Sequence, residues 1–193
     1  MKELLFGTNN AHKLEEIREM VGDRFAIRSL SDLGITLDPE ETEDTLLGNA
    51  LLKARAFAKE SGMPCFADDT GLMVAALDGR PGVYSARYAG ENCSYADNVA
   101  KLLTEMQGKE DRNAYFATVI AFVDGKQEWD FEGRVDGVIT STPQGEKGFG
   151  YDPVFLPNGE IQTFAEMPPQ AKHAISHRGR AMRQFAQFLA AYQ

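Results

Sequence analysis

The sequence predicts an α/β protein with a mixed β-sheet. In the first half of the 193-residue chain, short apolar segments alternate with amphipathic helical segments, a pattern typical of α/β folds. In the second half, residues 114–123 and 127–140 flank Asp124-Gly125-Lys126, which is a strong hairpin signal. A hairpin adds antiparallel strands, so the sheet is mixed. Neither an internal repeat nor a linker is found, and we expect one domain over residues 1–193.

The first half contains two helices among its strands. The expected elements are a strand over residues 2–7, a helix after residues 8–12, a strand over 25–30, a helix over 45–61, and strands over 64–67 and 72–76. The long helix has an apolar stripe and ends at Gly62, a typical C-terminal residue. Between the last two strands we expect the chain to turn, and Gly71 favours a tight turn there.

The second half is expected to begin with a turn and a helix. The turn is DGRPG, residues 78–82, and Ser94 with Asp97 resembles a capping box that opens a helix to about Met106. After the hairpin comes a glycine-rich loop, residues 143–153. The last helix has four apolar residues on one face: Met182, Phe185, Leu189 and Tyr192.

Composition limits the possible functions. The net charge of −9 argues against broad, non-specific binding to nucleic acid or to an anionic membrane. Two cysteines do not make a disulfide framework. No segment has the length of a membrane span, and the N-terminus lacks the apolar stretch of a signal peptide. We therefore expect a cytoplasmic protein.

Acidic and basic residues are separated along the chain. Residues 38–44 contain five acids, whereas after Glu166 there is no Asp or Glu. The four basic residues Lys172, Arg178, Arg180 and Arg183 follow Glu166. The two groups could meet in space around a metal ion and an anion.

The first strand-to-helix loop is a candidate anion site. A helix N-terminus offers free N–H groups and the positive end of the helix dipole. Thr8, Asn9 and Asn10 add polar groups to this loop. Lys13 lies in the first turn of the helix, where a positive charge is unfavourable because of the helix dipole, and a bound phosphate would explain a lysine there. The alternative is a capped helix with a solvated lysine. The loop matches neither the Walker A nor the GxGxxG pattern.

Adjacent carboxylates at Asp68 and Asp69 are a candidate metal site. Like charges side by side are costly, but carboxylates suit Mg²⁺, and Glu40 with Glu41 could complete the site. The alternative is a polar turn with an Asx hydrogen bond. Lys53 shares a helix face with Asn49 and would neutralise the carboxylates, unless that face is simply exposed to solvent.

Two further segments could bind a flat ring. In GEKGFGYDP the glycines allow close approach of a ligand, and Phe149 could stack on a ring beside Asp152. In KHAISHRG, His177 and Arg178 could donate hydrogen bonds to an oxo group or a phosphate. A flexible loop and a solvated basic helix face are the alternatives. His173 and His177 have the helical spacing of a zinc-binding pair, but HExxH is absent, so the sequence does not favour zinc. Together these features are those of a Mg²⁺–nucleotide site.

Several motifs resemble one family in order along the chain. They are TNNAHK, EET, GNALLKA, ADDTGL, GRPGVYSARYAG, GFGYDPVF and AISHRGRA. The sequence resembles the inosine triphosphate pyrophosphatases, the XTP/dITP diphosphatases that remove non-canonical purine nucleotides. The resemblance spans nearly the whole chain. Thr70 replaces the serine of many members, and Asn9 replaces a glycine common in bacterial members.

The resemblance implies an elongated α/β fold with two lobes and a central cleft, usually a homodimer, and Mg²⁺-dependent hydrolysis of ITP, dITP and XTP. It implies that Asp69 is the general base, supported by Asp68 and Lys53, with Glu41, Glu40 and Asp69 near the metal. The implied substrate-binding residues are Thr8, Asn9, Asn10, Ala11, His12, Lys13, Thr70, Phe149, Gly150, Tyr151, Asp152, Lys172, His177 and Arg178. Of these, residues 8–13 and Lys172 would hold the phosphates.

Two rival functions remain open on the sequence. One is a related pyrophosphatase that acts on modified pyrimidine or methylated nucleotides, and substrate profiling separates it. The other is a nucleotide- or RNA-binding module without catalysis. The carboxylates argue against the second, because binding phosphates alone does not call for four acids at one site.

Overall fold

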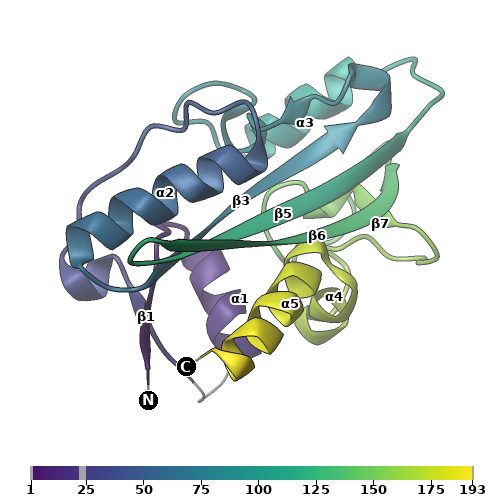
Figure 1. The fold of residues 1–193 in the computed structure, drawn as a ribbon. Coiled ribbons are helices and arrows are strands. Elements are labelled where there is room, and N and C mark those ends of the chain that lie inside the picture. Colours follow the sequence, from purple (N-terminus) through teal and green to yellow (C-terminus); the bar gives the residue numbers. More distant parts are fainter. Residues whose placement is uncertain (1, 22–24, 193) are drawn as a thin grey trace. The chain divides into compact units, whose positions relative to one another are not determined.

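The computed structural model describes residues 2–21 and 25–192 (Figure 1). The helices are α1 (Ala11–Val21), α2 (Leu46–Ser61), α3 (Tyr95–Glu105), α4 (Pro169–Ile175) and α5 (His177–Ala191). The strands are β1 (Glu3–Phe6), β2 (Ala26–Ser29), β3 (Cys65–Val74), β4 (Pro81–Gly82), β5 (Asn113–Asp124), β6 (Gln127–Ile139) and β7 (Phe155–Pro157).

These strands form a mixed sheet. Their order is β2-β1-β3-β5-β6-β7, with β4 also paired to β3. β1 is parallel to both β2 and β3, whereas β3–β4 and β6–β7 are antiparallel pairs. The predicted α/β class with a mixed sheet is therefore confirmed, and so is the hairpin that β5 and β6 make around Gly125.

The prediction of two strands separated by a turn at residues 67–71 is wrong. β3 is one continuous strand of ten residues. It pairs with β1 at its start and with β4 near its end, where Leu72 lies opposite Gly82. Gly71 serves this pairing rather than a turn, because a Cβ at Gly71 would lie 2.7 Å from the Gly82 carbonyl oxygen. The strand therefore holds both predicted carboxylates in its middle.

The described chain divides into two compact units. Unit 1 comprises residues 1–69, 118–133 and 179–193, and unit 2 comprises residues 70–117 and 134–178. β3, β5 and β6 each continue from one unit into the other. The central cleft expected from the resemblance stays a prediction.

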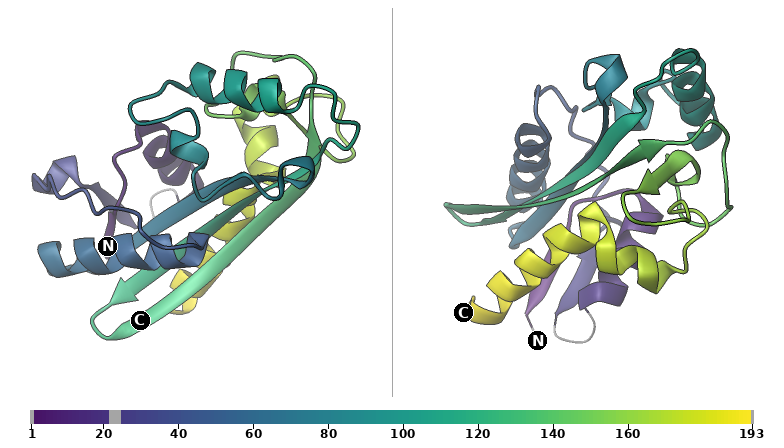
Figure 2. Two further views of the ribbon diagram at one scale, coloured as in Figure 1. Left: turned by 90° about the horizontal axis from the view of Figure 1, so that it is seen from above. Right: turned by 90° about the vertical axis from the view of Figure 1, so that its right-hand side faces the viewer.

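Unit 1 has helices on both faces of its strands. α2 covers one face of β1 and β3, and α1 with the greater part of α5 covers the other (Figures 1 and 2). Alternate residues of each strand face the two layers, as in any β-strand. The α2 layer contains Leu5, Leu30, Phe57 and Cys65. The other layer contains Leu4, Phe6, Ile17, Phe66, Ile120, Phe122, Ala181, Met182, Phe185 and Leu189.

Unit 2 has its own core. It contains residues of β3, α3, β5, β6 and the segment after β7, among them Leu72, Val99, Leu102, Phe116, Phe155 and Phe164. α3 begins with the predicted capping box, in which Ser94 and Asp97 bond each other's N–H groups. None of the described helices combines the length and apolar character needed to cross a membrane. The short elements β4, β7 and α4 were not predicted.

Candidate functional site

The two consecutive carboxylates of β3 are bound by two different helices of unit 1. Asp68 accepts a hydrogen bond from the ammonium group of Lys13 on α1, with Nζ–Oδ1 at 3.1 Å. The Asp69 Oδ1 atom lies 3.5 Å from Lys53 Nζ on α2. Neighbouring residues of a strand point to opposite faces, so each carboxylate meets the helix on its own side. Both carboxylates are buried, at 2 % and 6 % exposure.

Lys53 joins two acids. Its Nζ atom lies 2.6 Å from Glu41 Oε1 as well as 3.5 Å from Asp69 Oδ1. Burial lowers the pKa of Lys53, but the charges of Asp69 and Glu41 outweigh it and the pKa is raised. Burial raises the pKa of Asp69 above its ordinary value, with Lys53 opposing the rise and Glu41 adding to it. Asp69 is thus a more basic carboxylate than a solvated aspartate.

Asn49 holds the acidic segment against α2. Its side-chain Oδ1 accepts a hydrogen bond from the Glu43 N–H at 3.0 Å, and its Nδ2 donates to the Glu43 carbonyl at 3.3 Å. The solvent-facing alternative for Asn49 is wrong, because the residue is fully buried. By contrast, Glu40 is exposed. Of the two predicted glutamates, only Glu41 makes a described contact with Lys53.

The predicted anion loop caps α1. The Asn10 Oδ1 atom accepts hydrogen bonds from the N–H groups of His12 at 3.0 Å and Lys13 at 3.3 Å. The Thr8 hydroxyl accepts one from the Asn10 N–H at 3.1 Å. Asn9, Ala11 and His12 are exposed. The ion pair with Asp68 gives Lys13 a role that does not require a bound phosphate, so the phosphate role of this loop stays a prediction.

The carboxylates of unit 1 fit a Mg²⁺ ion that a substrate helps to bind. Within the described residues, no three His, Cys, Asp or Glu side chains converge as a metal centre. Mg²⁺, however, commonly takes only one or two protein carboxylates and completes its shell with water and phosphate oxygens. Asp69 Oδ2 is buried and has no hydrogen-bond partner among the described residues. Together with Glu41 it could hold the ion.

In unit 2, Asp152 organises the residues around Phe149. The Asp152 Oδ2 atom accepts a hydrogen bond from Lys172 Nζ at 2.8 Å and another from the Phe149 N–H at 2.9 Å. The ammonium of Lys172 lies 5.0 Å from the centre of the Phe149 ring, and the guanidinium of Arg178 lies 5.3 Å from it. Lys172, expected to hold phosphates, therefore contacts residues expected to bind the base.

His177 and Arg178 begin α5 and both are buried, so the alternative of a solvated basic helix face is wrong for these two residues. The imidazole of His177 stacks on Phe116, with ring centres 4.5 Å apart. Arg178 donates a hydrogen bond to the Thr70 hydroxyl at 3.3 Å.

The predicted residues thus form two groups, each within one unit. The carboxylate group of unit 1 contains Lys13, Glu41, Lys53, Asp68 and Asp69. The aromatic group of unit 2 contains Thr70, Phe149, Asp152, Lys172, His177 and Arg178. Asp69 and Thr70 are consecutive on β3, so the two groups are covalently joined. The sequence did not predict the support that Asn49 gives to the acidic segment, nor a role for Ser85, which lies in GRPGVYSARYAG, residues 79–90.

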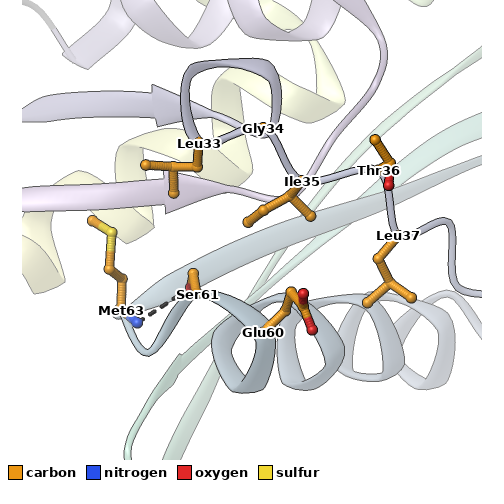
Figure 3. A pocket seen from close by; sticks show the side chains of 8 residues that line it. All are labelled: Leu33, Gly34, Ile35, Thr36, Leu37, Glu60, Ser61 and Met63. Carbon is orange, nitrogen blue, oxygen red and sulfur yellow. Dashed lines mark hydrogen bonds between the residues drawn. The ribbon is translucent and has the colours of Figure 1, made fainter.

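A pocket of about 540 Å³ lies elsewhere in unit 1 (Figure 3). It is lined by Leu33, Gly34, Ile35, Thr36, Leu37, Glu60, Ser61 and Met63, between the loop after β2 and the end of α2. None of the predicted site residues lines it. Its walls combine apolar side chains, such as Ile35 and Met63, with the polar side chains of Thr36, Glu60 and Ser61.

The fold and these groups define a class: an α/β protein with a lysine-neutralised carboxylate pair and a second group in which lysine and arginine side chains contact an aromatic ring. Residues 4–188 match the Ham1 family model. The chain belongs to the Ham1 family, and the resemblance predicted from its motifs is confirmed.

Known relatives cover almost the whole chain. A Porphyromonas gingivalis protein named dITP/XTP pyrophosphatase is 50 % identical over 98 % of this chain and 98 % of its own. The solved Ham1 structure from Staphylococcus aureus superposes with a TM-score of 0.90 at 38 % identity and covers 100 % of both chains. A Coxiella burnetii HAM1 structure gives a TM-score of 0.91 at 38 % identity, covering 99 % of this chain and 100 % of its own.

Proposed function

We propose that this protein is a Mg²⁺-dependent nucleoside triphosphate pyrophosphatase that hydrolyses dITP, XTP and ITP to the nucleoside monophosphate and pyrophosphate. The name of the half-identical relative supports the reaction class and the substrates dITP and XTP. The observation that carries the proposal is Asp69, a buried carboxylate of raised pKa with one oxygen unused among the described residues. Such a group is suited to accept a proton in a water-excluded site.

In the proposed reaction, Asp69 accepts a proton from a water molecule whose oxygen attacks the α-phosphorus. The bond between the α-phosphorus and its bridging oxygen to the β-phosphorus breaks, and pyrophosphate leaves. Lys13 and Lys53 supply fixed positive charge near the reacting phosphates. Burial raises the pKa of Asp69, and the positive charge of Lys53 opposes that rise and so favours the ionised carboxylate. When bound, Mg²⁺ would neutralise phosphate charge and the charge that develops on the leaving pyrophosphate.

We propose that the aromatic group selects the purine base of the substrate. Phe149 would stack on the purine, and hydrogen-bond donors among Lys172, His177 and Arg178 would bond the oxygen at C6 of hypoxanthine and xanthine. Adenine has an amino group at that position, so buried donors would be left unpaired, which is a large penalty. Guanine also has the C6 oxygen, and its rejection requires exclusion of the C2 amino group. Equal kcat/KM for ITP and GTP would refute such a C2 filter.

The test is pyrophosphate release from a nucleotide panel. Purified protein is incubated with dITP, XTP, ITP, dATP, GTP and a modified pyrimidine triphosphate, with Mg²⁺ and with excess chelator. We expect one pyrophosphate and one monophosphate per turnover of the first three, no inorganic phosphate, and no turnover in chelator. Preference for the pyrimidine would favour the related pyrophosphatase, and binding without turnover would favour a non-catalytic module.

A homodimer is proposed on the resemblance alone. Light scattering coupled to size-exclusion chromatography measures the mass directly. A particle of twice the 21.3 kDa chain mass is the expected result, and a particle of 21.3 kDa would exclude it.

A further inference from the structure

One buried serine joins three segments of unit 2. Ser85 lies in residues 79–90 and is 6 % exposed. Its hydroxyl accepts a hydrogen bond from the Leu72 N–H of β3 at 2.9 Å and donates one to the Gly82 carbonyl of β4 at 2.6 Å. Its own carbonyl accepts a hydrogen bond from the Tyr151 hydroxyl at 2.7 Å. Ser85 therefore connects β3, β4 and the glycine-rich loop.

Tyr151 lies in the same loop as two of the proposed ring-binding residues, Phe149 and Asp152. Tyr151 is buried, and burial raises the pKa of its hydroxyl, so the group remains a proton donor at neutral pH. The next residue, Asp152, bonds both the Phe149 N–H and Lys172. Phe149 and Gly150 are only half-buried. The loop thus has a buried attachment at Tyr151 and a more open surface at Phe149.

The strand side of this attachment is also tightly defined. β4 approaches β3 so closely that a Cβ at Gly71 would lie 2.7 Å from the Gly82 carbonyl oxygen. The Ser85 hydroxyl bonds that same carbonyl and the N–H of Leu72, three residues after Asp69. The position of Ser85 is therefore set by the strand that contains Asp69 and Thr70.

We propose that Ser85 is a positioning residue for purine binding: through the Tyr151 hydroxyl it fixes the loop of residues 148–152, and with it Phe149 and Asp152, on β3. The inference rests on the proposed function. A loop held in its binding conformation does not have to be ordered when the ligand arrives, and this strengthens binding. Ser85 itself acts through Tyr151, and neither hydroxyl is needed for the chemical step.

The first test is Tyr151→Phe, which removes the hydroxyl and keeps the buried ring. We expect KM for dITP to rise roughly tenfold, as for one lost buried hydrogen bond, with kcat within about twofold of wild type. Inhibition by pyrophosphate, which lacks a base, should be unchanged. The control is Tyr115→Phe, since Tyr115 is in the same unit and its ring lies 3.6 Å from the Arg134 guanidinium. A purely structural role predicts a lower melting temperature with unchanged KM.

A second variant separates the contact of Ser85 with Tyr151 from its contacts with β3 and β4. Ser85→Ala keeps the carbonyl that binds Tyr151 but removes the hydroxyl that bonds β3 and β4. We expect a raised KM in this variant too, and in the double variant a KM increase smaller than the product of the single effects, because both changes loosen one attachment. If Ser85→Ala does not fold, Tyr151→Phe alone decides.

A third readout needs no substrate. Hydrogen exchange of the amides of residues 148–152 is measured in the free protein, where the Phe149 N–H is bonded to Asp152. Faster exchange in Tyr151→Phe but not in Tyr115→Phe is expected. Unchanged exchange overturns the inference, and so does an unchanged KM in an active variant. A wild-type protein that hydrolyses none of the panel would instead refute the proposed function, while the exchange result still decides the role of Ser85.

Discussion

Individual residues explain how two adjacent carboxylates are tolerated in the middle of a buried strand. An unpaired buried charge costs several kcal/mol, but Asp68 has Lys13 on one face and Asp69 has Lys53 on the other. The sequence identified all four residues as candidates. The sequence also predicts that Lys53 neutralises the carboxylates, but not that Lys13 pairs with Asp68. That pair depends on the alternation of side chains along a continuous strand, whereas a turn is expected at Gly71.

The first residue-scale prediction concerns Asp69. Asp69→Asn keeps the shape of the side chain but cannot accept the proton, so kcat should fall by roughly 10²- to 10⁴-fold while KM changes by less than about threefold. Steady-state pyrophosphate release with dITP measures both constants. Asp130→Asn, an exposed acid of β6, is the control and should retain wild-type kcat. Near-normal turnover of Asp69→Asn would remove this residue from the role of base.

The second concerns the hydroxyl of Thr70, which accepts a hydrogen bond from Arg178. Thr70→Val has nearly the same shape but leaves a buried guanidinium N–H without this acceptor, at a cost of about 1–3 kcal/mol. We expect kcat/KM for XTP to fall roughly tenfold, corresponding to about 1.4 kcal/mol. Thr70→Ser restores the hydroxyl and should recover most of the activity. Wild-type activity in the valine variant together with a loss in the serine variant would show that the methyl group matters, not the hydrogen bond.

At the scale of elements, predictions succeeded where the determining chemistry is local. α2 begins after Thr45, whose side chain accepts a hydrogen bond from the Gly48 N–H at 3.0 Å, and it ends at Gly62 in the left-handed conformation, close to the predicted 45–61. β4 and β7 have two and three residues and exist through pairing with β3 and β6. Their partners are distant in sequence, so periodicity within the segment could not reveal them.

The prediction at this scale concerns the N-terminus of α2, the helix that contains both Asn49 and Lys53. Thr45→Ala removes the N-cap acceptor and should lower the free energy of unfolding by about 1 kcal/mol. Urea denaturation followed by far-UV circular dichroism measures the change. Thr42→Ala, in the exposed segment before the helix, is the matched control and should change stability by less than about 0.5 kcal/mol. Equal effects of the two substitutions would contradict the capping role.

For the whole molecule, the α/β class followed from the alternation of segments, but the division into units did not. Unit 1 is assembled from three separate stretches of chain and unit 2 from two. A boundary of this kind has no compositional signal, because it crosses β3, β5 and β6 in their interiors. It also passes between Asp69 and Thr70. The carboxylate and aromatic groups therefore belong to different units, although these two members of them are consecutive in sequence.

Shared strands predict that the two units unfold together. Leu102, fully buried in the core of unit 2, is replaced by alanine, which should cost about 2–5 kcal/mol. Trp129, the single tryptophan, packs against the core of unit 1, and its ring centre lies 5.5 Å from that of Phe122. Because β3, β5 and β6 contribute to both cores, loss of one core should remove support for the other. The urea midpoint of Trp129 fluorescence should therefore fall as far as the midpoint of far-UV circular dichroism.

The reciprocal substitution completes this test. Leu189→Ala opens a comparable cavity in unit 1 and should lower both midpoints as well. If Leu102→Ala leaves the fluorescence midpoint at the wild-type value while circular dichroism shows two steps, the units unfold independently. Three common strands would then be too weak to couple the cores, and the two-state treatment of stability would fail for this protein. Coincident transitions in both variants would instead show that a core substitution in unit 2 also lowers the stability of unit 1, which contains Asp69.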